Sequence, residues 1–324
     1  MKPVHAENRE WPRGTFVVRV SRNPASLHTR IEALARELGV EVVAASTGFG
    51  DAGSGGLGSG SIEDVKRPSI AAAGGEGVDQ TAFGAVWHLL EKQAGLKFTS
   101  LSLRALPNAD LSRFNVIILP DGRYGALGRH GADVLKEWAG RGGALIGLGN
   151  GGIWFTEKEI GLTTASRVEG DPKKEDKKDE KPVPKPDVPP VKPQQQLSLP
   201  GAIFRATLDT THFLGFGCGT GDMTEIAVPL SGDTFLKPSE KGSSVVTFGK
   251  ENLRLSGFTW PGNTEKFLAN TAYVVDEPTG RGHVILFLAD PASRAAWIGL
   301  RRMLLNAIAF GPSRVAMTLI GAAE

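Results

Sequence analysis

The sequence has a single cysteine, Cys218, among 324 residues. Disulfide frameworks and thiolate metal clusters need several cysteines, so both are excluded. No run of about 20 apolar residues is present, which argues against a transmembrane helix. The opening stretch MKPVHAENREWPRG has no apolar core of the kind that secretory signals carry. We therefore expect no signal peptide in the chain as given, and its localisation stays open.

An excess of charge of one sign is also missing. Lysine and arginine number 37 against 35 aspartate and glutamate, for a formal net charge of +2. The one lysine-dense stretch, residues 171–190, is interleaved with acids and prolines. It forms no basic face, so we expect no nucleic-acid partner. With 40% hydrophobic residues, the composition is that of an ordinary globular protein.

What the sequence does have is a clear strand–helix–strand pattern over Asn115–Gly152. Val116–Leu119 is apolar at every position, Gly131–Gly140 has apolar residues at helical spacing, and Ala144–Ile146 is a second apolar run. Fully apolar runs are typical of strands covered on both faces, and the helix between them suits a parallel crossover. The sequence therefore predicts a βαβ unit in a mostly parallel sheet.

Further elements of both kinds extend this unit and predict an α/β fold, with a doubly wound, mostly parallel sheet and an added β-rich second half. The predicted strands and helices are the following: strands Ser69–Ala73, Phe98–Leu103, Ala202–Leu208, Glu225–Val228, Ser244–Phe248, Leu253–Phe258, Ala272–Val275 and His283–Leu288; helices Thr81–Gln93 and Ala292–Phe310.

Composition divides the chain into three parts. Residues 1–66 read as a strand–helix–strand segment, with strands Thr15–Val20 and Val40–Ala45 around a helix whose apolar stripe runs from Leu27 to Leu38. Residues 67–311 form the α/β domain, and residues 312–324 form a tail. An insert at 168–196 interrupts the domain; it is rich in lysine, glutamate and proline, and we expect it to be disordered.

Four residues lie where a ligand site is expected. Ligands of such sheets bind beyond the carboxyl ends of the strands. Asp121 and His130 follow the strand Val116–Leu119, and Gly149 and Asn150 follow the strand Ala144–Ile146. Asp121 is expected either to shape its turn or to contact a ligand. These four are the candidate ligand-cleft residues.

A zinc site is a second hypothesis to weigh. His88 and Glu91 form an H-x-x-E pair, and His212 lies far downstream, which are the residue types of carboxypeptidase A-type zinc sites. However, His88 falls inside a predicted helix whose Trp87 and Leu90 should face the core. We expect His88 and Glu91 to bond to each other or to water, and we expect no metal and no cofactor.

Several segments of the sequence together resemble part of a known protein family. They are WPRGTFVV at 11–18, WHLLE at 87–91, VIILPD at 116–121, GGALI at 142–146, HFLGFG at 212–217 and GRGHVILF at 280–287. The chain resembles the C-terminal region of large bacterial zinc carboxypeptidase-like proteins, where a class I glutamine amidotransferase-like domain follows the peptidase domain. The resemblance implies a class I amidotransferase-like, flavodoxin-like sheet. It also implies a zinc carboxypeptidase domain as partner in cis or trans, and an extracytoplasmic location if the parent peptidase is secreted.

The catalytic parts of that setting have no counterpart in this sequence. Amidotransferases of this class carry a cysteine on a glycine-flanked elbow between strand and helix. The corresponding turn reads GLGNGG at 147–152, with Asn150 and glycines but no cysteine or serine. We therefore assign no catalytic residue. The leading hypothesis is a non-catalytic accessory module; the alternatives are a free-standing domain that binds a small molecule or glycan, and a hydrolase using His130 and Asp121 with water.

Overall fold

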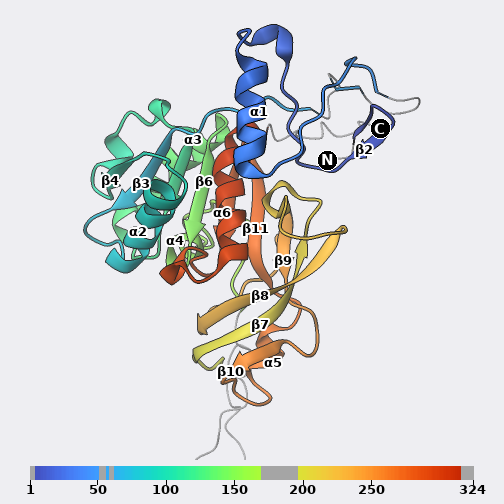
Figure 1. The fold of residues 1–324 in the computed structure, drawn as a ribbon. Helices are drawn as coiled ribbons and strands as arrows, with labels where there is room; N and C mark the ends of the chain where they lie inside the picture. Colours follow the sequence, from blue (N-terminus) through green and yellow to red (C-terminus); the bar gives the residue numbers. More distant parts are fainter. Residues whose placement is uncertain (1–3, 51–55, 58–61, 169–195, 315–324) are drawn as a thin grey trace, which may run out of the picture.

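The protein forms one large sheet that contains both parallel and antiparallel strand pairs (Figure 1). The computed structural model describes residues 4–50, 56–57, 62–168 and 196–314. The ten strands follow the order β10-β7-β9-β11-β12-β6-β5-β3-β4, and β8 pairs with β7. The predicted α/β class is confirmed. Of the predicted insert 168–196, residues 169–195 lie outside the described residues, as do residues 315–324 of the predicted tail 312–324.

The parallel half carries the strands that the sequence predicts best. Its order, reading the strands along the chain, is 2-1-3-4-5, which is the flavodoxin-like order. Every position of the central strands is buried, because helices or other strands cover both faces. The strands, from the edge inward, are β4 (Phe98–Ser102), β3 (Ile70–Gly74), β5 (Val116–Leu119), β6 (Ala144–Leu148) and β12 (Gly282–Phe287).

Helices cover both faces of this half. The crossover from β3 to β4 and the crossover from β5 to β6 run in opposite directions along the sheet. Right-handed connections therefore place α2 (Gln80–Trp87) and α3 (Gly128–Gly140) on opposite faces. The helix α6 (Ile298–Phe310) lies on the α2 side, where Arg301 donates a hydrogen bond to Gln93. The sheet is doubly wound, as predicted (Figure 1).

The antiparallel half continues the same sheet from β12. β11 (Ala272–Thr279) pairs with β12 on one side and with β9 on the other. A short helix, α5 (Thr264–Leu268), follows the edge strand. The remaining strands are β7 (Leu199–Asp209), β8 (Met223–Gly232), β9 (Ser243–Thr247) and β10 (Arg254–Gly257).

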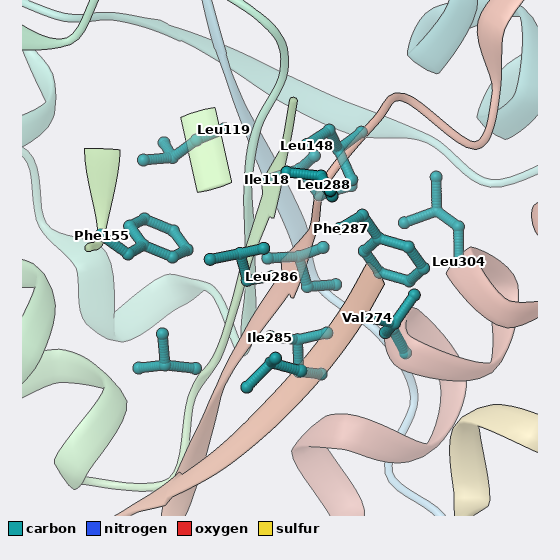
Figure 2. Close-up of a cluster of buried hydrophobic side chains, with 14 of the residues drawn as sticks. Ile118, Leu119, Leu148, Phe155, Val274, Ile285, Leu286, Phe287, Leu288 and Leu304 are labelled. Atoms are coloured by element: carbon teal, nitrogen blue, oxygen red, sulfur yellow. The ribbon is translucent and has the colours of Figure 1, made fainter. Parts of the chain in front are cut away.

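The core is continuous across both halves (Figure 2). Side chains from β12 and β11, such as Phe287 and Val274, lie between α6 and the sheet, while Phe155 packs on the other side against β5 and β6. Ile118, Ile285 and Leu304 are all fully buried. Within the described residues, no helix has the length and apolar character needed to cross a bilayer.

Two predicted helices are interrupted. The helix predicted over Ala292–Phe310 begins only at Ile298, because Arg294 and Ala295 both have φ of 53°, which an α-helix does not accept. The helix predicted over Thr81–Gln93 changes to π-helical hydrogen bonding at His88.

The N-terminal segment differs most from its prediction. The helix α1 (Leu27–Leu38) is present, but the strands predicted at Thr15–Val20 and Val40–Ala45 are wrong. A strand needs a partner for its backbone hydrogen bonds, and neither run pairs with any described strand. Only a small hairpin precedes α1, formed by β1 (Val4–Ala6) and β2 (Arg9–Trp11).

Much of this segment is exposed despite its apolar residues. Helix α1 has no buried residue. The exposed large apolar side chains of the segment include Phe16, Val18, Val20, Leu34, Leu38, Val40, Val42, Val43 and Phe49. The division of the chain at residue 66 remains a proposal, but the contrast in burial across it is clear.

Replacing Ile118 by aspartate tests the sheet core. Ile118 is fully buried in β5, so Ile118→Asp should lower the free energy of unfolding by roughly 4 kcal/mol or more, because an unpaired carboxylate would be buried. Leu255→Asp on the exposed edge strand β10 is the control and should cost less than about 1 kcal/mol. Urea unfolding measures both; equal losses would contradict the placement of β5 at the centre.

Candidate functional site

The carboxyl ends of the parallel strands bring four polar residues to one edge of the sheet. Asp79 follows β3, Asp121 follows β5, Asn150 follows β6, and Asp290 follows β12. Two of these, Asp121 and Asn150, are predicted from the sequence. Asp79 and Asp290 were missed, although each also follows an apolar strand run.

The turn after β6 is a sharp elbow that leads directly into the five-residue helix α4 (Asn150–Trp154). Its turning point is Gly149, with φ 56° and ψ −127°, a conformation that only glycine adopts freely. Gly151 is also required, because a Cβ there would lie 2.5 Å from the backbone oxygen of Pro120. The geometry of a nucleophile elbow is therefore present, with glycine at the position that projects toward the edge.

Asp121 fills the space beside that glycine. Its Oδ1 accepts hydrogen bonds from the backbone N of Asn150 at 3.1 Å and from Asn150 Nδ2 at 2.8 Å. A Cβ built on Gly149 would lie 3.0 Å from Asp121 Cγ. The carboxylate thus caps the start of α4 and occupies the place into which a side chain at the elbow would point.

Backbone contacts close the crevice between β3 and β5, the point where the strand order reverses. The backbone N of Asp79 donates to the carbonyl oxygen of Asp121 at 2.9 Å, and Arg123 N donates to Gly77 O at 2.7 Å. Val78 and Gly122 form an antiparallel bridge between these hydrogen bonds. Because ligands of such folds usually enter at this reversal, the closure limits a ligand to the outer side, near Asn150.

The edge is acidic, and this changes the titration of Asp290. Burial raises the pKa of Asp290 to about 6, against a hydrogen bond from Ala292 N and with further increase from the charges of Asp121 and Asp79. Burial and the charge of Asp121 also raise the pKa of Tyr124, whose hydroxyl donates to Pro120 O at 2.8 Å. Tyr124 therefore stays protonated, and Asp290 titrates near neutral pH.

His130 does not lie in a loop. It occupies the first turn of α3 and is exposed, and its side chain makes no hydrogen bond with Asp121. Asp121, its proposed partner in a hydrolase, is held by Asn150 instead. The structure brings Asp121, Gly149 and Asn150 together and leaves His130 outside this contact.

The residues weighed for zinc or thiol chemistry lie elsewhere. His88 is half-buried, and Glu91 accepts a hydrogen bond from Trp87 Nε1 at 3.0 Å rather than from His88. The expectation that Trp87 faces the core is also wrong, since it is 38% exposed. Within the part of the chain that the structure describes, no group of three acidic, histidine or cysteine side chains is arranged so that it could hold a metal ion.

A buried cluster that the sequence did not reveal joins β11, β12 and the loop after β7. Asp276 Oδ1 lies 2.9 Å from His283 Nδ1, and Asp276 Oδ2 lies 3.1 Å from His212 Nε2. Leu214 N donates to His212 Nδ1, so the Nε2 of His212 carries the proton toward Asp276. Burial alone would raise the pKa of Asp276, but the hydrogen bonds and charges of the two histidines outweigh it and lower the pKa to about 2.

Replacing Asp276 by asparagine tests how much this cluster contributes to the free energy of unfolding and to its loss in acid. The folded-state pKa lies below the ordinary value of 3.8, so the carboxylate contributes stability above about pH 4 and loses it as the pH falls toward 2. Asp276→Asn should cost about 3 kcal/mol at pH 7 and remove that part of the acid dependence. Urea titrations between pH 7 and pH 2 measure it; the exposed Asp233→Asn is the control. An unchanged acid slope in Asp276→Asn would contradict the assignment.

Comparison with known proteins finds similarity of structure alone. No family model matches the sequence, and no curated protein matches it. A glutamine amidotransferase from Thermotoga maritima has 8% identity and a TM-score of 0.43, over 75% of this chain and 96% of that one. A cytoplasmic protein from Salmonella typhimurium has 12% identity and a TM-score of 0.42, over 76% and 100%.

Glycosidases also occur among the similar structures. A β-galactosidase from Bacillus circulans sp. alkalophilus has 14% identity and a TM-score of 0.41, over 74% of this chain and only 30% of that one. All three TM-scores lie below 0.5, so the architecture rests on the strand order and registers of the chain itself. The structural neighbours of this α/β domain thus include a glutamine amidotransferase and glycosidases.

Proposed function

We propose that this chain is a non-catalytic, amidotransferase-like accessory module that works beside a zinc carboxypeptidase-like domain, in cis or in trans. The observation that carries the proposal is the elbow after β6. It keeps the backbone geometry of a nucleophile-bearing turn, but Gly149 stands at the turning point and offers no side chain.

The surroundings of the elbow oppose thiolate chemistry as well. Amidotransfer needs a nucleophile whose pKa is lowered, by a helix N-terminus or by nearby positive charge. Asp121 would lie within van der Waals distance of any side chain at Gly149, and Asp290 belongs to the same edge. Carboxylates raise the pKa of a neighbouring thiol, so this edge disfavours a thiolate even if a cysteine were supplied.

The only native thiol offers no substitute. Cys218 lies in the turn after β7, and burial raises its pKa, although the charge of Arg302 works in the opposite direction. Its Sγ is near Phe216 O, and it has no contact with the elbow among the hydrogen bonds of the described residues. A half-buried thiol whose pKa is raised is a weak nucleophile at neutral pH, although it can still be alkylated slowly.

The exposed apolar surface of residues 4–50 supports an accessory role. Phe16 is 66% exposed and Leu38 is 65% exposed, on a segment whose helix α1 has no buried residue. Monomeric proteins rarely leave such a group of apolar residues in water, and interfaces between domains or chains are the usual reason. The identity of the partner as a carboxypeptidase-like domain comes from the resemblance of the sequence.

A free-standing binding domain is the second candidate. Asn150 is exposed beside the Asp121 carboxylate, and amide and carboxylate groups suit the hydroxyl groups of a glycan or other small polar molecule. The site is shallow, since the crevice between β3 and β5 is closed by backbone contacts. This candidate predicts ligand-dependent stabilisation with no turnover.

A cysteine placed at the elbow tests the central claim. In the double variant Gly149→Cys, Cys218→Ala, the pKa of the new thiol should be at or above the ordinary value of about 8.5. Adding Asp121→Asn should lower that pKa by about one unit, since the nearby charge is removed. Iodoacetamide alkylation rates against pH give both values. A thiol pKa well below 8.5 with Asp121 intact, or glutamine hydrolysis by the variant, would refute a non-catalytic elbow.

The accessory role has its own test in the N-terminal helix. The zinc carboxypeptidase-like domain encoded nearest to this chain in the source genome should bind the wild type in sedimentation velocity. Leu34→Asp with Leu38→Asp should abolish binding, because charge would replace the apolar stripe of α1. Thr29→Asp with Arg36→Asp, on the opposite side of the same helix, is the matched control. Binding that survives the stripe variant, or no binding by the wild type, contradicts the proposed partner surface.

A further inference from the structure

An apolar pocket lies between the β7–β8 hairpin and the start of α6. None of the residues that line it belongs to the candidate site at the carboxyl ends of the parallel strands. The volume of the pocket is about 250 Å³. Leu208, Ile226 and Ala227 line it from the hairpin, and Trp297, Leu300 and Met303 line it from the helix side. An apolar cavity of roughly 150 Å³ already holds a benzene ring, so this pocket has room for a longer hydrocarbon group.

The walls of the pocket carry no charged side chain. The Cys218 thiol is their most polar side-chain group apart from the Trp297 indole, and burial keeps that thiol protonated by raising its pKa. Ile298 stands at the rim and is 75% exposed. Since pockets lined in this way gain affinity by removing apolar ligand surface from water, the part of a ligand inside the pocket must be hydrocarbon.

An arginine, Arg302, lies close to this apolar wall. Arg302 is one helical turn beyond Ile298 and Gly299, and helical side chains lie over the turn that precedes them. Its Nε donates to Phe216 O at 3.2 Å, and its Cζ would lie 2.7 Å from a Cβ on Gly217, the neighbour of Cys218. Arg302 is exposed, and its charge acts on the Cys218 thiol, which lines the pocket.

The backbone that forms the helix side of the wall is held in an unusual conformation. Arg294 and Ala295 are consecutive non-glycine residues with φ of 53°. Left-handed backbone is costly for such residues and persists only where the surrounding structure imposes it. The turn delays the start of α6 and presents Trp297 and Ile298 to the pocket, instead of continuing the helix over them.

We propose that this pocket binds a linear apolar monocarboxylate, such as a medium-chain fatty acid, with its hydrocarbon tail in the pocket and its carboxylate on Arg302. The tail accounts for the uncharged wall, and the carboxylate accounts for the placement of one exposed guanidinium at the rim. The proposal does not depend on the function assigned to the strand-end edge.

The rate at which Cys218 is alkylated can report on occupancy of the pocket, because Cys218 lines the pocket and is the only cysteine of the chain. Alkylation of the full-length protein by N-ethylmaleimide should slow by about tenfold at saturating decanoate, since a bound tail would cover most of the pocket wall. Decanol should protect as well, but more weakly. If neither compound slows alkylation, the pocket is not a hydrocarbon site and the proposal fails.

The role of Arg302 has a separate arm. Arg302→Gln should raise the decanoate concentration needed for half-protection by about fivefold and leave that for decanol unchanged, as expected for one exposed charge pair. Arg254→Gln, at an exposed arginine on β10, is the matched control and should change neither. Equal effects of Arg302→Gln on both ligands, or none on decanoate, would overturn the assignment of the carboxylate.

Filling the pocket completes the test. Ile226 is half-buried on β8 and lies on the same face of the hairpin as Leu208, so Ile226→Trp can fill the pocket and should abolish protection by both ligands. Ser231→Phe on the same strand, outside the lining, should leave protection intact. Phosphatidylcholine vesicles should give no protection; protection by vesicles but not by decanoate would identify a lipid surface and overturn the proposal.

Discussion

Two buried carboxylates on one strand hold the halves of this sheet together. Asp276 and Glu277 are adjacent in β11, so their side chains point to opposite faces. Asp276 is bonded by two histidines, one from β12 and one from the loop after β7. Glu277 accepts hydrogen bonds from Thr164 and Ser239, which belong to two other segments. A buried charge is tolerated only when it is paired and fully hydrogen-bonded, so each of these segments must keep its place for β11 to join the parallel and antiparallel halves.

These carboxylates also show where reasoning from sequence stops. The apolar runs at Val116–Leu119 and Ala144–Ile146 predict their strands and the parallel order, because burial on both faces leaves a continuous signature. The predicted strand Ala272–Val275 ends too early, since charged residues ordinarily mark the end of a buried strand. The strand in fact continues to Thr279. Its acids are satisfied by partners up to 113 residues distant in the chain, and no local pattern contains that information.

The candidate site was predictable in part, for the same reason. Strand ends are local features, so the sequence places Asp121 and Asn150 at one edge correctly. The sequence does not predict that Asp290 lies at the same edge. It also does not predict that the loops after β3 and β5 close the crevice between these strands. Both features depend on which strands become neighbours in the sheet. Gly149 shows the limit most clearly. A glycine-rich turn predicts backbone freedom, whereas only the three-dimensional elbow reveals that the Asp121 carboxylate fills the space of a missing side chain.

The N-terminal helix α1 exposes apolar side chains that a stable helix of this length ordinarily buries. Helix α1 has 12 residues, and isolated helices of that length are marginal in water even with favourable composition. Most helical stability in proteins comes from burial of an apolar stripe, yet none of the residues of α1 is buried within the described part of the chain. Leu27, Ile31 and Ala35 are half-buried, whereas Leu34 and Leu38 are exposed, so part of the apolar stripe of α1 is open to solvent in the described part of the chain. The proposed accessory role depends on this combination of an exposed apolar stripe and an elbow that carries no nucleophile.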